Sequence, residues 1–214
     1  ITALNNFQDH GVVVFANSNE DTYNNADIHS ALPQIYSQLN EAWIVANNVD
    51  ITGSTYTRKS AKCGSTAAYC ISADGYKING AAYYTDGSYF VTAGTQGTSF
   101  VAPQVSGAIA ILAEAFPSQT PAQWTDRLLA SADNSFFTAD ASVEFANGIT
   151  HGYNTDFGHG IMDIYAALRP ITSSKMAESI LVGDNIENAN IYSLKNSKIL
   201  LDTSFGDSVS NALK

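Results

Sequence analysis

The amino-acid sequence predicts an α/β fold in which helices flank a mostly parallel β-sheet. Two apolar runs, GVVVF at residues 11–15 and AWIVANNVD at residues 42–50, have the composition of strands buried on both faces of a parallel sheet. Helical patterns begin near residues 99 and 120, and strands that alternate with helices indicate an α/β architecture. The 214 residues and the 45% hydrophobic content suffice for one domain with a substantial core, with or without a tail.

The next elements along the chain are a third strand and a long helix. The strand, AAYCISADG at residues 67–75, ends in a turn, and the helix begins at Ser99 after a turn that contains Gly94 and Gly97. Pro103 falls near the first turn of this helix, where proline is tolerated. Because few polar residues interrupt the apolar spacing, we expect a helix buried nearly all round. The apolar positions are Val101, Val105, Ala108, Ile109, Leu112 and Phe116.

A second helix has clear start signals. Thr120 is the expected cap, Pro121 takes the first helical position and Gln123 completes a capping box. Trp124, Leu128 and Ala132 then form the expected inward stripe. Residues 157–168, FGHGIMDIYAAL, indicate a glycine turn followed by a short helix. After residue 170 the sequence is polar without core periodicity, so we expect a domain over residues 1–170 and an extension or connector over residues 171–214.

Charge and composition exclude several classes of function. The net charge of -10 and the pI near 4.5 leave no basic surface that would attract nucleic acid. No apolar run approaches the length expected of a membrane span. The chain starts at Ile1 with no secretion signal, so we expect it to begin inside a longer or processed protein.

The two cysteines, Cys63 and Cys70, lie close together in KCGSTAAYC. Their short spacing and even number favour a small-loop disulfide in an oxidising compartment over the alternative of two reduced cysteines in the core. No further Cys or His follows at ligand spacing, so the sequence predicts no metal site here.

Ser99, in GTQGTSFVAPQVSG at residues 94–107, has two interpretations. A serine at a helix start usually caps the helix by accepting a backbone hydrogen bond. Alternatively it is a nucleophile, because glycines allow close approach by another molecule and the free N–H groups of a helix start stabilise an oxyanion. The residues alone leave both interpretations open.

A family resemblance favours the second interpretation. GTSFVAP followed by QVSGAIAIL resembles the nucleophile segment of the subtilisin-like serine proteases, the subtilases. GVVVFANSNED is similar to the strand that delivers their oxyanion-hole asparagine, and FGHGIMDIYAAL to their glycine-rich turn and last helix. SALPQIYSQLNEAWIVANNVD and KCGSTAAYC are similar to a bacterial secreted branch that includes autotransporter subtilases with a short-loop disulfide. The resemblance covers residues 11–170 and implies the C-terminal part of a subtilase catalytic domain.

The resemblance implies roles for particular residues. Ser99 would be the nucleophile, and its backbone N–H one oxyanion donor. The Asn19 side chain would be the second donor, with Asn17 as the alternative, because Asn17-Ser18-Asn19 stands where the family has Ala-Gly-Asn. The segment around Asn19 would line the substrate pocket through Ala16, Asn17, Ser18 and Glu20. Glu20 could bias the pocket towards basic substrate residues, although a glutamate in a surface turn is usually just solvated. Many subtilases bind calcium, but no dense run of carboxylates marks a calcium site in this chain.

The general base and its orienting acid have no match in the sequence. Subtilases carry Asp, then His, then Ser, but none of the four histidines follows the family's Gly-Thr-His pattern. Asp9 and His10 precede a buried strand, where a helix-ending loop is the ordinary explanation. We expect His159 to be structural, and His29 and His151 to be solvated. The base and acid would then belong to a part of the domain before Ile1, and the chain alone would hydrolyse nothing at enzyme-like rates.

The sequence thus predicts a serine endopeptidase that acts on proteins or peptides, secreted or at the cell surface. The alternative is a pseudoprotease or binding module that keeps the subtilase fold without its base. An α/β-hydrolase is disfavoured, because GTSFV lacks the second glycine of the Gly-x-Ser-x-Gly elbow.

Overall fold

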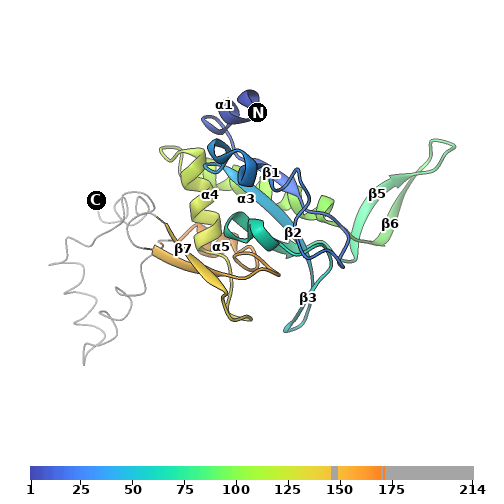
Figure 1. Cartoon of the computed structure of the whole chain (residues 1–214). Helices are drawn as coiled ribbons and strands as arrows, with labels where there is room; N and C mark the ends of the chain where they lie inside the picture. Colours follow the sequence, from blue (N-terminus) through green and yellow to red (C-terminus); the bar gives the residue numbers. More distant parts are fainter. Residues whose placement is uncertain (146–148, 170, 172–214) are drawn as a thin grey trace, which may run out of the picture.

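The computed structural model describes residues 1–145, 149–169 and 171 (Figure 1). Its body is an α/β structure with a central sheet, two separate hairpins and helices packed on the sheet. The expected extension over residues 171–214 lies, apart from Ile171, outside the described residues. The domain boundary at residue 170 therefore stays a prediction.

The central sheet is built on β2 (Trp43–Thr52), which has neighbours on both sides. β1 (Val13–Ala16) and β4 (Cys70–Asp74) both pair with β2 in parallel, in the registers Val13↔Trp43 and Val45↔Cys70. The far half of β2 also pairs with β3 (Thr55–Arg58), which returns antiparallel to it. The mostly parallel sheet expected from the sequence is confirmed.

Helices and hairpins complete the described chain. Two antiparallel hairpins stand outside the central sheet, and the sequence pattern gave no expectation for either of them. They are β5 (Ile78–Tyr83) with β6 (Tyr89–Thr95), and β7 (Ala141–Phe145) with β8 (Ile149–Tyr153). The helical segments are α1 (Thr2–Gln8), α2 (Leu32–Ile35), η1 (Ser37–Leu39), η2 (Gly64–Tyr69), α3 (Thr98–Ala115), α4 (Pro121–Ala130) and α5 (Ile164–Ala167).

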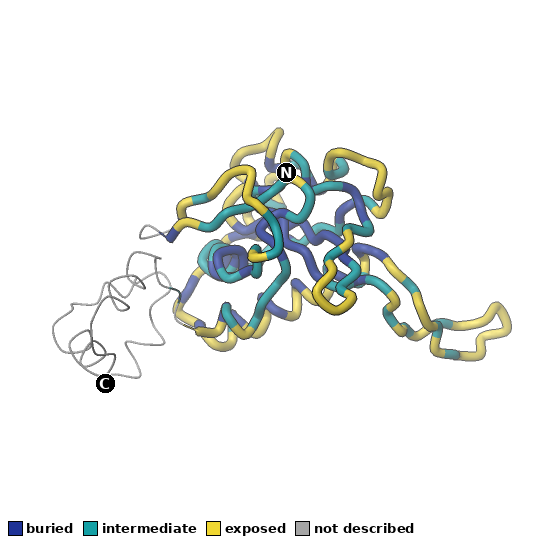
Figure 2. The backbone as a smooth tube through the Cα atoms, turned by 90° about the horizontal axis from the view of Figure 1, so that it is seen from below, coloured by how far each residue is buried: buried dark blue, intermediate teal, exposed yellow. Residues whose placement is uncertain are grey.

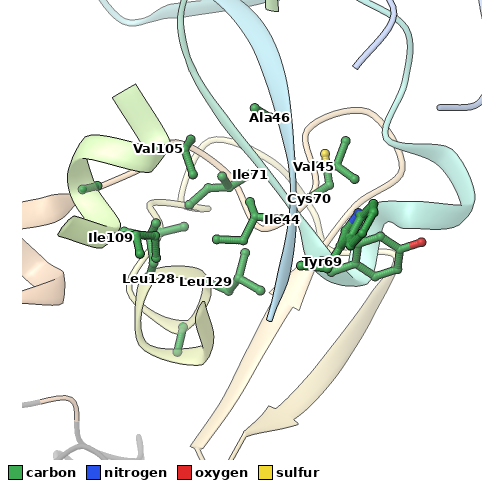
Figure 3. Close-up of a cluster of buried hydrophobic side chains, with 14 of the residues drawn as sticks. Ile44, Val45, Ala46, Tyr69, Cys70, Ile71, Val105, Ile109, Leu128 and Leu129 are labelled. Carbon is green, nitrogen blue, oxygen red and sulfur yellow. The ribbon is translucent and has the colours of Figure 1, made fainter. Parts of the chain in front are cut away.

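The hydrophobic core lies between the sheet and the pair α3 and α4. Figure 3 shows Val105 and Ile109 of α3 and Leu128 of α4 facing Ile44 and Ile71 of the sheet. β2 is buried along its first seven residues, as expected for a strand in the centre of a parallel sheet. The strand GVVVF is less buried than expected, because Val13 is the one fully buried residue of β1. β1 therefore forms a partly open edge of the described sheet.

The expectation that α3 is buried nearly all round is wrong. The positions expected to be apolar and inward are buried, but the opposite face of the helix is exposed to solvent. The sheet covers one side of α3, and no described element covers the other. Several residues on the exposed face are small, so the sequence pattern suggested a helix buried on all sides. The exposed residues include Pro103, Gln104, Ser106, Gly107, Ala110, Ile111 and Glu114.

α3 is the described element that bears on the expectation about membrane spans. Among the described residues, this helix alone is long and apolar enough to cross a bilayer by length and composition. The test is weak, since core helices of soluble proteins pass it too, and α3 packs against β1, β2 and α4.

The expected start of α4 is confirmed. Thr120 Oγ1 accepts a hydrogen bond from the Gln123 N–H, and Gln123 Oε1 accepts one from the Thr120 N–H. Leu128 and Ala132 are buried as expected, while Trp124 is half-buried. The sequence did not indicate that Arg127 would be buried as well. Its guanidinium lies 3.8 Å from the centre of the Phe116 ring and donates to the backbone carbonyls of Ala167 and Arg169.

A disulfide joins Cys63 to Cys70, with the two Cα atoms 6.0 Å apart. It closes the short helix η2 into a loop directly before β4. Of the two interpretations of this cysteine pair, the disulfide is therefore the one that the structure contains. A short closed loop restricts the unfolded chain and so favours the folded one.

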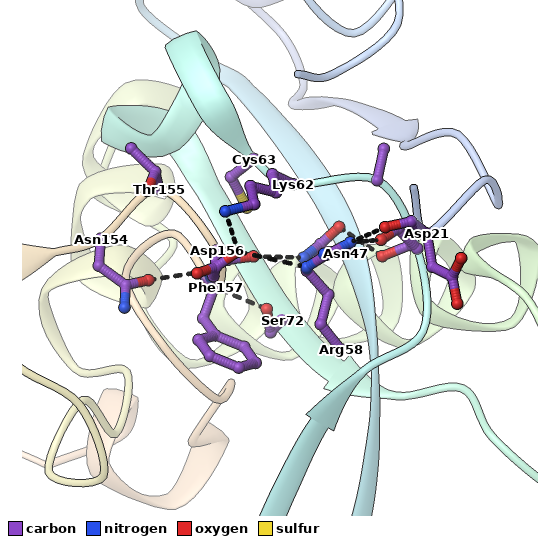
Figure 4. A network of polar contacts seen from close by, with 12 residues as sticks. Asp21, Asn47, Arg58, Lys62, Cys63, Ser72, Asn154, Thr155, Asp156 and Phe157 are labelled. Atoms are coloured by element: carbon purple, nitrogen blue, oxygen red, sulfur yellow. Dashed lines mark hydrogen bonds and ion pairs between the residues drawn. The ribbon is translucent and has the colours of Figure 1, made fainter. Parts of the chain in front are cut away.

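A polar network fixes the 154–158 turn to the sheet (Figure 4). The Asp156 carboxylate lies 3.4 Å from Arg58 Nε and 3.1 Å from Lys62 Nζ, while the Asp156 carbonyl accepts from Asn47 Nδ2. Ser72 Oγ donates to the Phe157 carbonyl.

Gly158 has a φ of +63°, and a Cβ there would lie 2.2 Å from the Cys70 carbonyl oxygen. Only glycine fits this close approach between the turn and β4.

The hairpin β5–β6 projects from the body as an arm (Figures 1 and 2). Tyr83, Tyr89 and Val91 on it are at least 73% exposed, and its strands have no described neighbour beyond each other. At its base, Thr95 Oγ1 donates to the Ile78 carbonyl. The arm leads through Gly97 directly into α3.

His151 and His159 form a pair inside the domain, so the expectation of a solvated His151 is wrong. Their Nδ1 atoms lie 3.0 Å apart, and their Nε2 atoms face the carbonyls of Ala132 and Ala68. Two neutral imidazoles carry two ring protons, whereas the three contacts would need three. Adding the third proton would place a positive charge on the pair, away from water. Desolvation therefore lowers the pKa of His151 and lowers that of His159 to about 4. His159 is structural, as expected.

This pair makes stability depend on pH. Between pH 6.5 and 4 the unfolded chain binds a proton at His159 that the folded chain does not bind, so stability falls as the pH falls through this window. We expect the free energy of unfolding to drop by about 2–3 kcal/mol from this group between pH 7 and 4.5. Urea titrations at both pH values measure it. His159→Gln should flatten the difference, whereas the exposed His29→Gln should not; equal pH dependence in all three proteins would contradict the assignment.

The buried Arg127 should be essential for stability. Arg127→Ala leaves the carbonyls after α5 without their donor, so we expect the free energy of unfolding to fall by about 3 kcal/mol. Urea denaturation followed by circular dichroism measures this. The control is Arg169→Ala, whose guanidinium stacks on Tyr165 at the surface and should change stability by less than about 1 kcal/mol. A similar small effect for both variants would show that the Arg127 contacts are not needed.

Candidate active site

Three strands end together beside the start of α3. β1, β2 and β4 run parallel, so their carboxyl ends lie at the same edge of the sheet. The 17–20 segment follows β1, Asn48 lies on the second half of β2, and Gly75 follows β4. This edge is where parallel α/β sheets usually bind ligands.

Gly75 connects β2 and β4 to the turn before Ser99. Asn48 Oδ1 accepts a hydrogen bond from the Gly75 N–H, and the Gly75 carbonyl accepts one from the Gly97 N–H, both at 3.0 Å. A Cβ on Gly75 would lie 2.7 Å from the Gly97 carbonyl oxygen and from Asn48 Oδ1. Gly75 therefore has to be glycine for the turn to pack this closely. Sequence reasoning missed both Asn48 and Gly75, although two adjacent asparagines inside a buried strand were a usable signal.

Ser99 lies in the first turn of α3 with an exposed side chain. The N-cap is Gly97, which has no side chain to cap the helix, so Ser99 is not the cap that one interpretation predicted. Gly97 has a φ of +154°, a conformation that side-chain-bearing residues rarely adopt. Within the described chain the Ser99 N–H has no hydrogen-bond acceptor, as is usual in the first turn of a helix. The Ser99 hydroxyl and N–H are thus both available to another molecule.

Asn19 lies directly beside this turn. Its Oδ1 accepts hydrogen bonds from the Thr98 N–H at 2.8 Å and from Thr98 Oγ1 at 3.1 Å. Thr98 Oγ1 also lies 2.6 Å from the Asn17 carbonyl oxygen. The hydroxyl has one proton, which it can donate to either of these two oxygens. The oxygen side of the Asn19 amide is therefore fixed to the residue before Ser99. The Asn19 Nδ2 group has no acceptor among the described residues, and it remains a free donor.

Asn17 is placed differently. Its side chain is buried and packed inside the domain, with Nδ2 within 3.2 Å of Asn47 Oδ1 and of the carbonyls of Ala61 and Lys62. Its Oδ1 accepts from the Ser18 N–H. The Asn17 amide thus has no donor left for another molecule, in contrast to Asn19.

The other residues predicted to line the substrate pocket surround Asn19. Ala16 and Ser18 are half-buried, and the Ser18 carbonyl accepts from the Ala61 N–H. Glu20 is exposed, and its N–H donates to Ser18 Oγ. The segment is therefore held by its backbone while the Glu20 carboxylate faces solvent.

The histidines and acids lie elsewhere. His151 and His159 contact each other and two carbonyls, His29 is exposed beside Asp27, and His10 is exposed after α1. Asp9 is the C-cap of α1, as the helix-ending explanation predicts. In the described part of the chain, no group of three or more His, Cys, Asp or Glu side chains could hold a metal ion.

Known proteins share this architecture. Residues 2–160, most of the chain, match the subtilase family. No curated protein matches the chain. Among solved structures, PagA, a prenylagaramide maturation protease, is 22% identical with a TM-score of 0.52 over 78% of this chain and 53% of PagA. Fervidolysin from Fervidobacterium pennivorans, a keratinolytic enzyme related to subtilisin, is 22% identical with a TM-score of 0.51 over 80% of this chain and 24% of its own.

A third neighbour is the PatG macrocyclase, solved in complex with a peptide. It is 20% identical with a TM-score of 0.51, over 78% of this chain and 46% of its own. The chain thus spans about half of PagA and PatG, and about a quarter of fervidolysin. At identities this low the likenesses show a shared fold, and they agree with the family match. The chain belongs to the subtilase family.

Proposed function

We propose that this chain carries the nucleophile and the oxyanion hole of a serine endopeptidase. The observation that carries the proposal is the hydrogen bond from the Thr98 N–H to Asn19 Oδ1, because it fixes Asn19, whose amide nitrogen is a free donor, to the residue before the exposed Ser99. The family match supports a serine protease. The buried, fully engaged Asn17 amide favours Asn19 over Asn17 as the donor.

The proposed reaction follows from these groups. Ser99 Oγ attacks the carbonyl carbon of a peptide bond, and the carbonyl oxygen takes up negative charge. The Asn19 amide and the Ser99 N–H donate hydrogen bonds to that oxygen. The amine leaves with a proton, and an acyl group stays on Ser99 until water releases it.

The base that accepts the Ser99 proton would come from another part of the domain, as would its orienting acid. Three features support this. The exposed face of α3 carries small residues such as Gly107 and Ala110, against which another element can pack closely, and the outer edge of β1 has no described neighbour. The chain also spans only about half of PagA.

The substrate would be a polypeptide that lies along the 16–20 segment. The exposed Glu20 carboxylate would favour basic residues near the cleaved bond. Export to an oxidising compartment, by secretion or to the cell surface, is proposed from the disulfide. Calcium, which many subtilases bind, has no cluster of three carboxylate, His or Cys side chains to support it among the described residues.

The nucleophile can be tested by fluorophosphonate labelling of the complete gene product. We expect labelling to disappear in Ser99→Ala, because the reagent phosphonylates an activated serine hydroxyl. Ser106→Ala is the matched control, since Ser106 is also an exposed serine of α3 and its hydroxyl only bonds the Ala102 carbonyl. Labelling that persists in Ser99→Ala would refute the assignment. A folded complete product that takes no label would favour the binding-module alternative.

The donor role of Asn19 can be separated from its anchoring role. Asn19→Ala in the complete protein should lower kcat by about 10²–10³-fold, the usual loss for one oxyanion donor, with KM little changed. Asn19→Asp keeps an oxygen for the Thr98 N–H but loses the amide donor, so it should be at least as slow. Peptide hydrolysis kinetics measure both variants. If Asn19→Asp recovered most of the rate, Asn19 would only anchor α3.

A further inference from the structure

A pocket lies at the other end of β2 from Ser99. Its volume is about 390 Å³, and Trp43, the first residue of β2, lines it. The remaining walls come from Gln34 of α2, Asn40 after η1, and the elements η2, α4 and β7, none of which contributes to the Ser99 turn. The volume is in the range of small-ligand sites.

The inner wall of this pocket is apolar and aromatic. Trp43, Leu129 and Phe145 are buried there, and Tyr69 is buried too. The Tyr69 hydroxyl accepts from Gln34 Nε2. Such a wall can hold an alkyl chain, and aromatic rings also attract a cation.

A buried hydroxyl in the pocket has no partner. Thr125 is 3% exposed and lines the pocket, and its Oγ1 makes no hydrogen bond. Leaving a buried polar group unsatisfied is unfavourable, and most such groups in proteins are paired. The oxygen is covered by neighbouring atoms, so the side chain has to rotate before its hydroxyl can reach a ligand in the pocket.

Two carboxylates complete the polar side. Asp126 and Glu144 both line the pocket, and neither has an ion-pair partner among the described residues. Glu144 is exposed, whereas burial raises the pKa of Asp126 to about 6. A cation at this position would offset the unfavourable desolvation of the Asp126 carboxylate.

We propose that this pocket binds a primary ammonium group on an alkyl stem, such as a lysine side chain. An ammonium presents three N–H donors from a compact centre, which suits a pocket with two carboxylates, and a rotated Thr125 hydroxyl would supply the third acceptor. The stem would lie along Leu129 and the aromatic wall. A bare metal ion fits less well, because no cluster of three ligating side chains is found in the described chain.

Calorimetric titration of the chain with Nα-acetyl-lysine methylamide tests the proposal. We expect saturable binding, and at least tenfold weaker binding of the Nε-acetylated probe, which keeps the stem but loses the charge. Cadaverine distinguishes the source: tighter binding than the lysine probe indicates a free diamine, and weaker binding indicates a polypeptide lysine. No saturable binding to the folded chain, or equal binding of the charged and acetylated probes, would overturn the proposal.

Variants assign the binding to this pocket. Asp126→Asn should weaken binding at least tenfold and Thr125→Val several-fold, while the remote, exposed Asp21→Asn should leave it unchanged. Both pocket variants remove an unpartnered polar group, so we expect them to fold. In the wild type the affinity should rise with pH up to about 6 and then level off, since the ionised Asp126 binds the cation. Unchanged affinity in Asp126→Asn would overturn the proposal, and Ser99→Ala should have no effect on it.

Discussion

Parallel pairing of β2 with both β1 and β4 is the constraint on which the described structure depends. Because the three strands run in the same direction, the segments that follow β1 and β4 emerge at one edge of the sheet. Asn19 and Gly75 can therefore both reach the turn at Gly97, although they are far apart in the sequence. A reversed strand would take either contact to the other end of the sheet. The position of Ser99 therefore depends first on the sheet topology, and side-chain contacts then fix it.

The buried polar groups near this edge of the sheet form hydrogen bonds with one another. The Ser60 hydroxyl lies within hydrogen-bonding distance of Asn47 Oδ1, and it accepts from the Asn48 N–H. Asn17 joins the same group through Asn47. Buried amides that are paired in this way fix one arrangement of the strand ends, which a purely apolar layer would specify less sharply. Asn48 Nδ2 is an exception, since it is buried without a partner.

Local signals in the sequence predicted the elements well, and contacts between distant segments less well. The capping box at Thr120 and the buried strand β2 depend on neighbouring residues, and both appeared as expected. The solvent-exposed face of α3 did not, because alanine, glycine and serine suit an exposed face and a closely packed one alike.

Tertiary contacts explain the other misses at the site and in the core. The sequence identifies His151 as polar, but only the fold brings it 3.0 Å from His159. Likewise, the motif around Ser99 indicated a nucleophile, whereas the support from Asn48 through Gly75 required the register of two strands. Arg127 was unpredictable for the same reason, since the carbonyls that it binds are 40 or more residues away.

The separation between paired strands has a kinetic consequence. Val13 pairs with Trp43 and Val45 with Cys70, so each parallel contact closes a long loop, whereas β5–β6 and β7–β8 join neighbouring residues. Closing long loops loses chain entropy before any contact is gained, and folding slows as contacts become less local. The hairpins can therefore form early, while the strand ends that position the turn at Ser99 come together late.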